Sequence, residues 1–551
     1  MTPTAINRAI ADAVAPLRLA ERGRARADIE RYLATIGPAQ ASALSGTSDD
    51  PSVAGGTPLL RWWRDSIRVR DAAGDTLRAL PTQRGQIREL VRTNPIAGGA
   101  INTNVDRTVG TGLALVATPN RQVLGWEEEQ ALEFKRLVQT EFSLFADSTE
   151  CDWAGEQNFY DKQGLTLRSA LESGDCFTNL PDGDTSPSQP YHLRLQTLEA
   201  DRVGNPLNAA DTVDIAGGAR RAAGGRGVQS YYVYDTHPGS YLIGVGARYS
   251  GVWIDRIGTQ SGRRRILHHF RQLRPEQPRG VPYLAPVIEA IKQLGRYTEA
   301  EIQAAVVSAF FTMVVETENG SSPAPIFGST EAAVAADPEI AMAPAAVIGL
   351  AKGEKASFAN PTRPNTAFGP FVESILTQIG VGLSIPRELL IKQFNSSFSA
   401  SKAALLDAWM WFRGQRTWLA RSFCQPVYET WMAEAVSIGR IPAPGFFTDP
   451  LMRWAYTRAA WHGDSMGSIN PKDEVAAYLA AVDGRLMTRE RAEWELFGTD
   501  WYETFESKET EQEMLKAADL LPMPKAGAAA PAGTGAEPGD IPTDPAEPVK
   551  D

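Results

Sequence analysis

The chain has 551 residues, too many for one hydrophobic core, so about two to four structural units are expected. Hydrophobic residues make up 43% and charged residues 22% of the sequence, which are ordinary values for a globular protein. The formal net charge of −11 argues against a nonspecific nucleic-acid binder, so any contact with DNA must be local.

Cysteine content and hydropathy exclude several further classes. Cys151, Cys176 and Cys424 are an odd number without CxxC spacing, which disfavours a disulfide framework and a zinc site and predicts three buried thiols. Residues 1–34 lack the apolar core of a secretory signal. The most apolar helical run, residues 304–315, is shorter than the roughly 20 residues of a membrane span, so no membrane role is expected.

The first half of the chain mixes helices and strands, which predicts an α+β class rich in helix. Residues 1–58 pair a short charged helix with a Ser/Gly/Pro/Asp-rich stretch and are interpreted as a mobile arm. Apolar periodicity then predicts helices over residues 82–109, 126–145 and 159–173. Alternating patterns predict strands in YHLRLQTLE (191–199), SYYVYD (230–235) and ILHHF (266–270).

The second half reads as mainly helical. Helices are predicted over residues 283–315 and 368–383, separated by a Pro/Ala/Gly-rich stretch. An irregular region over residues 439–468 leads to Pro471, which suits the first turn of a helix to about residue 482. Residues 524–551 are nearly all Ala, Gly, Pro, Thr and acid, which predicts a disordered tail.

Residues 396–437 are the most informative stretch, because they predict one helix roughly 60 Å long at about 1.5 Å per residue. Pro426 lacks the amide hydrogen of an interior turn and should kink this helix. The helix carries tryptophans on two sides, which suggests neighbours on two sides and makes them candidates for contacts between subunits. The apolar positions are Leu405, Trp409, Phe412, Leu419 and Phe423, and the candidate tryptophans are Trp409, Trp411, Trp418 and Trp431.

No pattern of catalytic, cofactor-binding or metal-binding residues emerges. The five histidines have no metal-ligand spacing, and nucleophile, P-loop and kinase motifs are absent. Strand alternation predicts that one of His268 and His269 points inward and the other outward, in a structural role. The sequence therefore predicts no enzyme activity, no cofactor and no metal.

Basic residues on the long helix are the remaining lead. Lys402 and Arg413 lie three helical turns apart and Arg416 lies one turn further, so the three are predicted to share a face that could follow phosphates. The alternative interpretation is an ordinary solvated helix face.

Six separated segments carry recognisable motifs in a fixed order. Their sequences are RGQIRELVRTNPIAGGAINTNVDRTVGTGL (84–113), CDWAGEQNFYDKQGLTLRSALESGDCF (151–177), LQTLEADRVGNP (195–206), HHFRQLRPEQPRGVPYLAPVIEAIKQLGRYTEAEI (268–302), IGVGLSIPRELL (379–390) and INPKDEVAAYLAAVDGRLMT (469–488). Together they resemble the lambda-type portal proteins of tailed bacteriophages over roughly residues 60–500. One departure is Ser397 to Lys402, where the family usually has Asn-Tyr-Ser-Ser followed by arginine.

The resemblance implies a ring of about twelve copies at one capsid vertex, which forms in the host cytoplasm and remains in the virion. The implied partners are double-stranded DNA in the channel, the terminase large subunit, major capsid and scaffold proteins, and head–tail connector proteins. The implied anatomy is an N-terminal arm (1–58), wing (59–395), stem helix (396–438), clip (439–468), returning helix and crown (469–523) and tail (524–551).

Alternatives remain at this point. A second mapping makes residues 283–315 the descending stem helix and the following Pro/Ala-rich segment the clip. A second class of protein is another ring-forming head–tail connector component. A third is a phage DNA-processing hydrolase, which would need clustered carboxylates or histidines.

Overall fold

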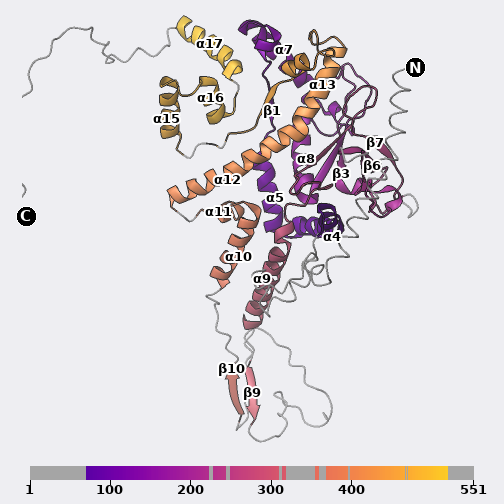
Figure 1. Cartoon of the computed structure of the whole chain (residues 1–551). Helices are drawn as coiled ribbons and strands as arrows, with labels where there is room; N and C mark the ends of the chain where they lie inside the picture. Colours follow the sequence, from indigo (N-terminus) through magenta and orange to yellow (C-terminus); the bar gives the residue numbers. More distant parts are fainter. Residues whose placement is uncertain are drawn as a thin grey trace, which may run out of the picture. The chain divides into compact units, whose positions relative to one another are not determined.

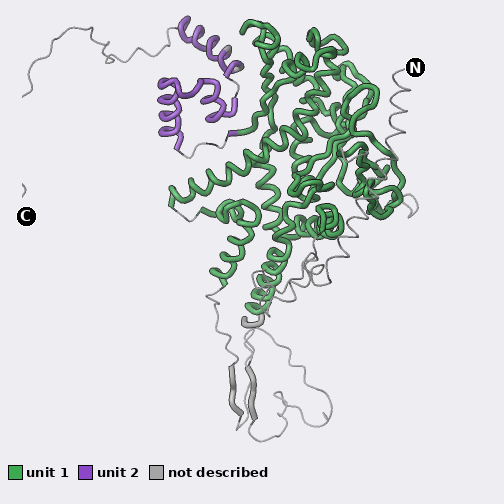
Figure 2. The backbone as a smooth tube through the Cα atoms, in the orientation of Figure 1, with its two compact units in different colours: residues 1–464 green, residues 465–551 purple. Residues whose placement is uncertain are grey.

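A computed structural model gives two compact units, residues 1–464 and 465–551 (Figures 1 and 2). The structure describes residues 70–222, 227–242, 248–309, 313–317, 354–358, 368–394, 397–465, 467, 470–499 and 501–518. The expected arm and tail lie outside these residues. The fold is mixed and rich in helix, so the predicted α+β class is confirmed.

The first helical region is divided, so the prediction of one helix over residues 82–109 is wrong. Helix α4 spans Ala72–Thr93 and α5 spans Pro95–Thr108. Pro95 drives the preceding Asn94 into an extended conformation (φ −113°, ψ 120°), which ends α4. The Asn94 side chain then caps α5 by accepting hydrogen bonds from the first free amides of that helix.

The next two helices lie where periodicity predicts them. Helix α7 spans Glu128–Ala146 and begins with a capping box between Glu127 and Gln130, while α8 spans Phe159–Ser173 with Asn158 as its cap. Strand β1 (Ala114–Ala117) and the short helix α6 (Arg121–Leu124) precede α7.

Two antiparallel sheets follow, and all three predicted strand regions contain strands. The first has the order β3–β2–β8 and the second the order β4–β5–β6–β7. Their bounds are β2 Asp175–Asn179, β3 Gln196–Glu199, β4 Ile215–Ala216, β5 Ala219–Arg221, β6 Val228–Tyr234, β7 Gly251–Asp255 and β8 Ile266–Phe270. Main-core residues cover one face of the first sheet, and a second cluster that includes Phe177, Leu198 and Tyr231 covers the other.

Because both faces of the first sheet are covered, the prediction that one of His268 and His269 points outward is wrong. The side chain of His268 is 6% exposed and His269 is fully buried, so neither points outward. Alternation does send the two rings to opposite faces, but both faces are buried. His269 Nε2 lies 2.9 Å from the Thr178 hydroxyl on the neighbouring strand.

Two helices and a hairpin follow the sheets. Helix α9 spans Ile288–Ala309, so the predicted helix ends short of residue 315, and β9 (Met313–Thr317) pairs with β10 (Glu354–Phe358). Helix α10 spans Phe368–Leu383 as predicted, and α11 spans Arg387–Leu390. Tyr297 of α9 stacks on Phe368 and meets Phe371 edge-on, both in α10, so the two helices lie side by side (Figure 1).

The long helix is continuous, as predicted. Helix α12 (Phe398–Leu419) passes through a π-helical turn (Ala420–Cys424) into α13 (Gln425–Ser437). The π turn ends two residues before Pro426, whose missing amide hydrogen leaves no regular helical bond to the Ser422 carbonyl within that turn. The irregularity therefore lies where the proline places it.

Residues after the long helix return to the core. Helix α14 spans Pro450–Tyr456, and β11 (Ala459–His462) pairs antiparallel with β1. Ile441, Phe446 and Tyr456 belong to the main hydrophobic cluster. The predicted irregular region therefore contains a helix and a strand that belong to the first unit.

The second unit contains α15 (Pro471–Asp483), α16 (Arg489–Phe497) and α17 (Trp501–Ala517). Pro471 occupies the first turn of α15, as predicted. Tyr478 donates to Glu495 over 3.0 Å and Lys508 pairs with Glu493 at 2.7 Å, which links the three helices to one another.

The burial of His269 makes stability depend on pH. Burial lowers the pKa of His269 to about 3, whereas an unfolded histidine has a pKa of about 6.5. As pH falls between these values, the unfolded chain takes up a proton that the folded chain does not. The free energy of unfolding should therefore fall by up to about 1.4 kcal/mol per pH unit from this residue.

Urea titrations between about pH 6.5 and 4 measure how steeply the free energy of unfolding falls with pH. This slope should be smaller in His269→Gln than in the wild type, by the equivalent of about one proton taken up on unfolding. Thr178→Ser, which keeps the hydroxyl beside Nε2, is the matched control and should keep the wild-type slope. An unchanged slope in His269→Gln would contradict the assignment.

Candidate functional site

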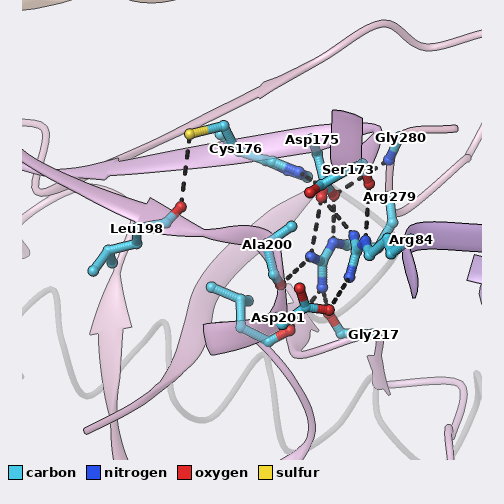
Figure 3. Close-up of polar contacts among 12 residues, drawn as sticks. Arg84, Ser173, Asp175, Cys176, Leu198, Ala200, Asp201, Gly217, Arg279 and Gly280 are labelled. Atoms are coloured by element: carbon cyan, nitrogen blue, oxygen red, sulfur yellow. Dashed lines mark hydrogen bonds and ion pairs between the residues drawn. The ribbon is translucent and has the colours of Figure 1, made fainter. Parts of the chain in front are cut away.

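A buried charge cluster lies at the start of β2, where the Asp175 carboxylate is fully buried (Figure 3). Arg84 of α4 donates from a terminal nitrogen to Asp175 Oδ1 over 2.7 Å. The Nε of Arg84 donates to the Ser173 carbonyl over 2.8 Å. A second acid, Asp201, pairs with Arg84 at 3.3 Å and also with Arg88. One side chain of α4 thus ties the end of α8 to the turn after β3.

Arg279 supplies the second guanidinium group and uses all five of its N–H donors. Two go to Asp175, from Nε over 2.5 Å and from one terminal nitrogen over 3.1 Å. The other three go to the carbonyls of Val203, Gly217 and Ala200 over 2.6 to 2.8 Å. No donor of this side chain is left for a ligand.

A histidine and two close glycines complete the cluster. His268 Nε2 lies 3.1 Å from Asp175 Oδ2, and the amide of Gly280 donates to the same oxygen over 3.3 Å. Gly174 has φ +87°, and a Cβ on it would lie 2.6 Å from the Gly280 carbonyl oxygen. Only glycine at both positions allows the two backbones to approach this closely.

The electrostatics follow from burial and pairing. Burial alone would raise the pKa of Asp175, but the charges of Arg279 and Arg84 together hold that pKa well below its usual range. Burial lowers the pKa of His268 despite its hydrogen bond to Asp175. The cluster is thus an ionised carboxylate held by two guanidinium groups beside an imidazole whose protonation burial disfavours.

This arrangement is structural in character. Its donors are consumed by partners within the chain, and its side chains are buried. Sequence reasoning missed the cluster, although the Gly-Asp and Arg-Gly motifs of the quoted segments contain its central residues. The sequence carried no sign that these motifs meet.

The candidate tryptophans all pack within their own chain. Trp411 donates to the Asn104 side chain over 2.9 Å and Trp418 donates to the Phe270 carbonyl over 3.2 Å. Trp409 is half-buried beneath a guanidinium group, and Trp431 is fully buried. The burial of Trp431 argues against its contact with a neighbouring subunit, whereas for the other three such a contact stays a prediction.

The three candidate DNA-contacting cations do not form one free face. Arg416 donates to the carbonyls of Thr108, Arg107 and Asp464 over 2.7 to 3.0 Å, so it fastens α12 to the end of α5. Burial lowers the pKa of Arg416. Arg413 is exposed and Lys402 is half-buried, and these two lie near one edge of the exposed helix face.

An apolar stripe runs along the exposed face of α12. Leu406 is 48% and Met410 is 74% exposed, and both project away from the side that carries Phe412 and Leu419 into the core. The helix therefore buries one side within the chain and leaves apolar side chains on another.

Within the described residues, no group of three or more His, Cys, Asp or Glu side chains is placed to hold a metal ion. The three cysteines are free thiols and buried, as predicted. The helices described are each too short or too polar to cross a membrane.

The comparisons with known proteins identify the class. A family model described as "Phage portal protein, lambda family" matches residues 58–416, more than half of the chain. The chain therefore belongs to the lambda family of phage portal proteins, and the resemblance inferred from the ordered motifs is confirmed.

Individual relatives are similar over most of their length. Portal protein B of Escherichia phage lambda is 26% identical over 501 residues, covering 86% of this chain and 91% of that protein. The portal protein of Escherichia phage N15 is 26% identical over 508 residues, with the same shares covered. Among solved structures, a chain in the virion of a native gene transfer agent particle matches 74% of this chain and 91% of its own, at 12% identity and a TM-score of 0.39.

Replacing Asp175 by asparagine should destabilise the protein severely. The neutral amide would leave the guanidinium group of Arg279 buried without an ionised partner, which is expected to lower the free energy of unfolding by about 3–5 kcal/mol in urea titrations.

The control is Asp75→Asn, which breaks an ion pair with Arg274 at the surface. It should lower the free energy of unfolding by at most about 1 kcal/mol. Similar values for the two variants would mean that the cluster does not hold the fold together.

Proposed function

We propose that this portal protein assembles into a ring of about twelve copies at one capsid vertex and forms the channel for packaging and ejecting double-stranded DNA. In this proposal the ring is also the platform for the terminase large subunit and for head–tail connector proteins. It contacts the major capsid and scaffold proteins, and it assembles in the host cytoplasm before it becomes part of the virion. Membership of the portal family carries the proposal.

The exposed stripe on α12 supports assembly. An apolar surface of this kind is stabilised when a neighbour removes it from water, and a ring requires that each copy contact two neighbours through two different surfaces. Leu406 and Met410 are therefore our candidates for one of these surfaces. The other ring-forming connector class is disfavoured because the family match covers the central segments of the chain.

The second anatomical mapping has the better support. Helices α9 and α10 lie side by side, and the chain between them contains the paired strands β9 and β10. Residues 439–464, in contrast, pack into the main core. We infer that α9 and α10 form the stem and that the segment between them forms the clip.

The proposal assigns no covalent chemistry to the chain. The donors of the buried cluster around Asp175 are engaged by partners within the chain. The acidic net charge suits a channel wall that DNA slides past. Many exposed cations would hold phosphates tightly, so a few, such as Lys402 and Arg413, are the appropriate number for weak contacts.

Negative-stain electron microscopy of the purified full-length protein tests the assembly. We expect rings with an axial hole for the wild type, and folded single protomers for Leu406→Asp with Met410→Asp, because two charges would be buried at the contact. Leu273→Asp, which alters a 69% exposed apolar side chain elsewhere, should leave rings intact. Wild-type protein that stays monomeric or dimeric across salt and protein concentrations would refute the ring.

An in vitro packaging assay tests the channel contacts. Lys402→Glu with Arg413→Glu should give normal rings that retain less DNA, because two attractive contacts with phosphates become repulsive. Arg78→Glu with Arg121→Glu, two exposed cations on α4 and α6, is the matched control and should retain DNA normally. Unchanged retention in the first variant would show that these side chains do not contact DNA.

A further inference from the structure

The second unit, drawn in purple in Figure 2, buries little apolar surface in the part that the structure describes. Among residues 470–518, Ala492 alone is buried. Helix α16 contacts both α15 and α17, and residues of all three helices line a groove of about 740 Å³. A unit of about fifty residues with so little burial gains little stability from its own packing, so the groove is a surface that a partner would stabilise by covering it.

The groove is apolar along its length. Helix α15 contributes Leu479 and Val482, which lie one turn apart on the same face. Helix α17 lines the groove over residues 501–515, which is about 21 Å of helix. Leu479 is 58%, Phe497 is 67% and Phe505 is 44% exposed. Large apolar side chains are therefore open to solvent within a concave surface.

The walls of the groove suit a third helix. Apolar side chains at three- and four-residue spacing on a helix interlock with the matching rows of two neighbouring helices. An extended peptide needs backbone partners such as a free strand edge, and the described residues of this unit form no strand. The wall formed by α17 matches about four turns of a bound helix. The shape therefore favours an amphipathic helix as the occupant.

The rim of the groove is acidic. Three exposed carboxylates that line it form no ion pair with the described residues, and they belong to Asp483, Glu509 and Glu511. The fourth lining acid, Glu493, pairs with Lys508 at 2.7 Å, so Arg489 is the one unpaired cation among the described lining residues. An apolar groove with such a rim is complementary to a helix whose apolar face is flanked by lysine or arginine.

The charge of the whole unit disfavours a second copy of it as the occupant. Residues 470–518 include twelve acidic and six basic residues. Two such units repel each other at close approach, whereas a basic partner is attracted.

We propose that the groove between α15 and α17 binds an amphipathic helix of another protein. In the proposed contact, the apolar face of that helix packs on Leu479, Phe497 and Phe505, and its basic edges pair with the free carboxylates of the rim. The contact is independent of the proposed ring and of the proposed DNA channel.

A designed peptide tests the contact with the full-length protein. The probe is a fluorescein-labelled helix of about 18 residues, with leucine along one face, lysine at both edges of that face and alanine elsewhere. Fluorescence anisotropy should show saturable binding of one peptide per chain, weaker at high salt because the charges are then screened. The same peptide with glutamate in place of every lysine should bind about tenfold more weakly.

Variants of the apolar wall show whether the peptide occupies the groove. Leu479→Asp with Phe505→Asp should weaken binding of the lysine peptide about tenfold, because contact would then bury two charges. Leu486→Asp with Met514→Asp is the matched control, since it alters two exposed apolar side chains of the same unit outside the groove. This control should bind the peptide like the wild type. Circular dichroism establishes that both double variants are folded.

Charge reversal at the rim tests the electrostatic part of the recognition. Glu509→Lys with Glu511→Lys should weaken the lysine peptide about tenfold and strengthen the glutamate peptide by a similar factor. Glu490→Lys with Glu513→Lys changes the net charge equally at two exposed acids outside the groove. That variant should keep the wild-type preference for the lysine peptide.

Three results would overturn the proposal. The first is the lack of saturable binding to the wild type. The second is equal weakening in the groove variants and their controls, which would mean a nonspecific attraction to an acidic surface. The third is release of subunits from an assembly as the peptide binds, measured by analytical ultracentrifugation, which would assign the groove to a second copy of this chain.

Discussion

The carboxylate of Asp175 is ionised at a position with no access to water, and this constrains the first unit more than any other contact described. Transfer of such a charge from water costs several kcal/mol unless guanidinium groups compensate for it. The compensating arginines come from α4 and from the segment before α9, 91 and 104 residues away. The sheet, the first helix and the entry to α9 are therefore held in one arrangement. Because Arg279 also lies over the Phe177 ring, the cluster joins the second hydrophobic cluster to its surroundings.

The long helix depends on the arrangement of the sheet and the helices around it, because its second half is buried against them. The rings of Phe423 and Trp431 pack on the side chains of α7 and α8, and His269 of β8 contacts Phe423 beside the π turn. The first half is anchored differently, by Trp411 and Arg416 on α5. A helix fixed along one side in this way presents its opposite side as a rigid surface, which suits assembly better than a loop does.

Local signals in the sequence predicted local structure well. Caps and apolar periodicity located α7, α8, α10 and the long helix, and period-two patterns located β6 and β8. The failures have a common physical cause, since each depends on contacts between distant segments. The burial of His268 depends on a second cluster formed by β3 and β6, and the engagement of Arg416 depends on carbonyls of α5. The single helix predicted over residues 82–109 is different, because Asn-Pro was a local signal that should have ended it.

The contrast between Arg416 and Arg413 shows why a cationic helix face is weak support for a DNA contact. Both lie on the same helix at similar spacing from Lys402, but three backbone carbonyls engage Arg416, so a phosphate would have to displace them. Availability of the donors, rather than their sequence spacing, decides which cation can meet DNA. Leu406 and Met410 lie on the exposed face of α12, and Lys402 and Arg413 lie near one edge of it, so the apolar part favours contact with protein and leaves any contact with phosphates to that edge.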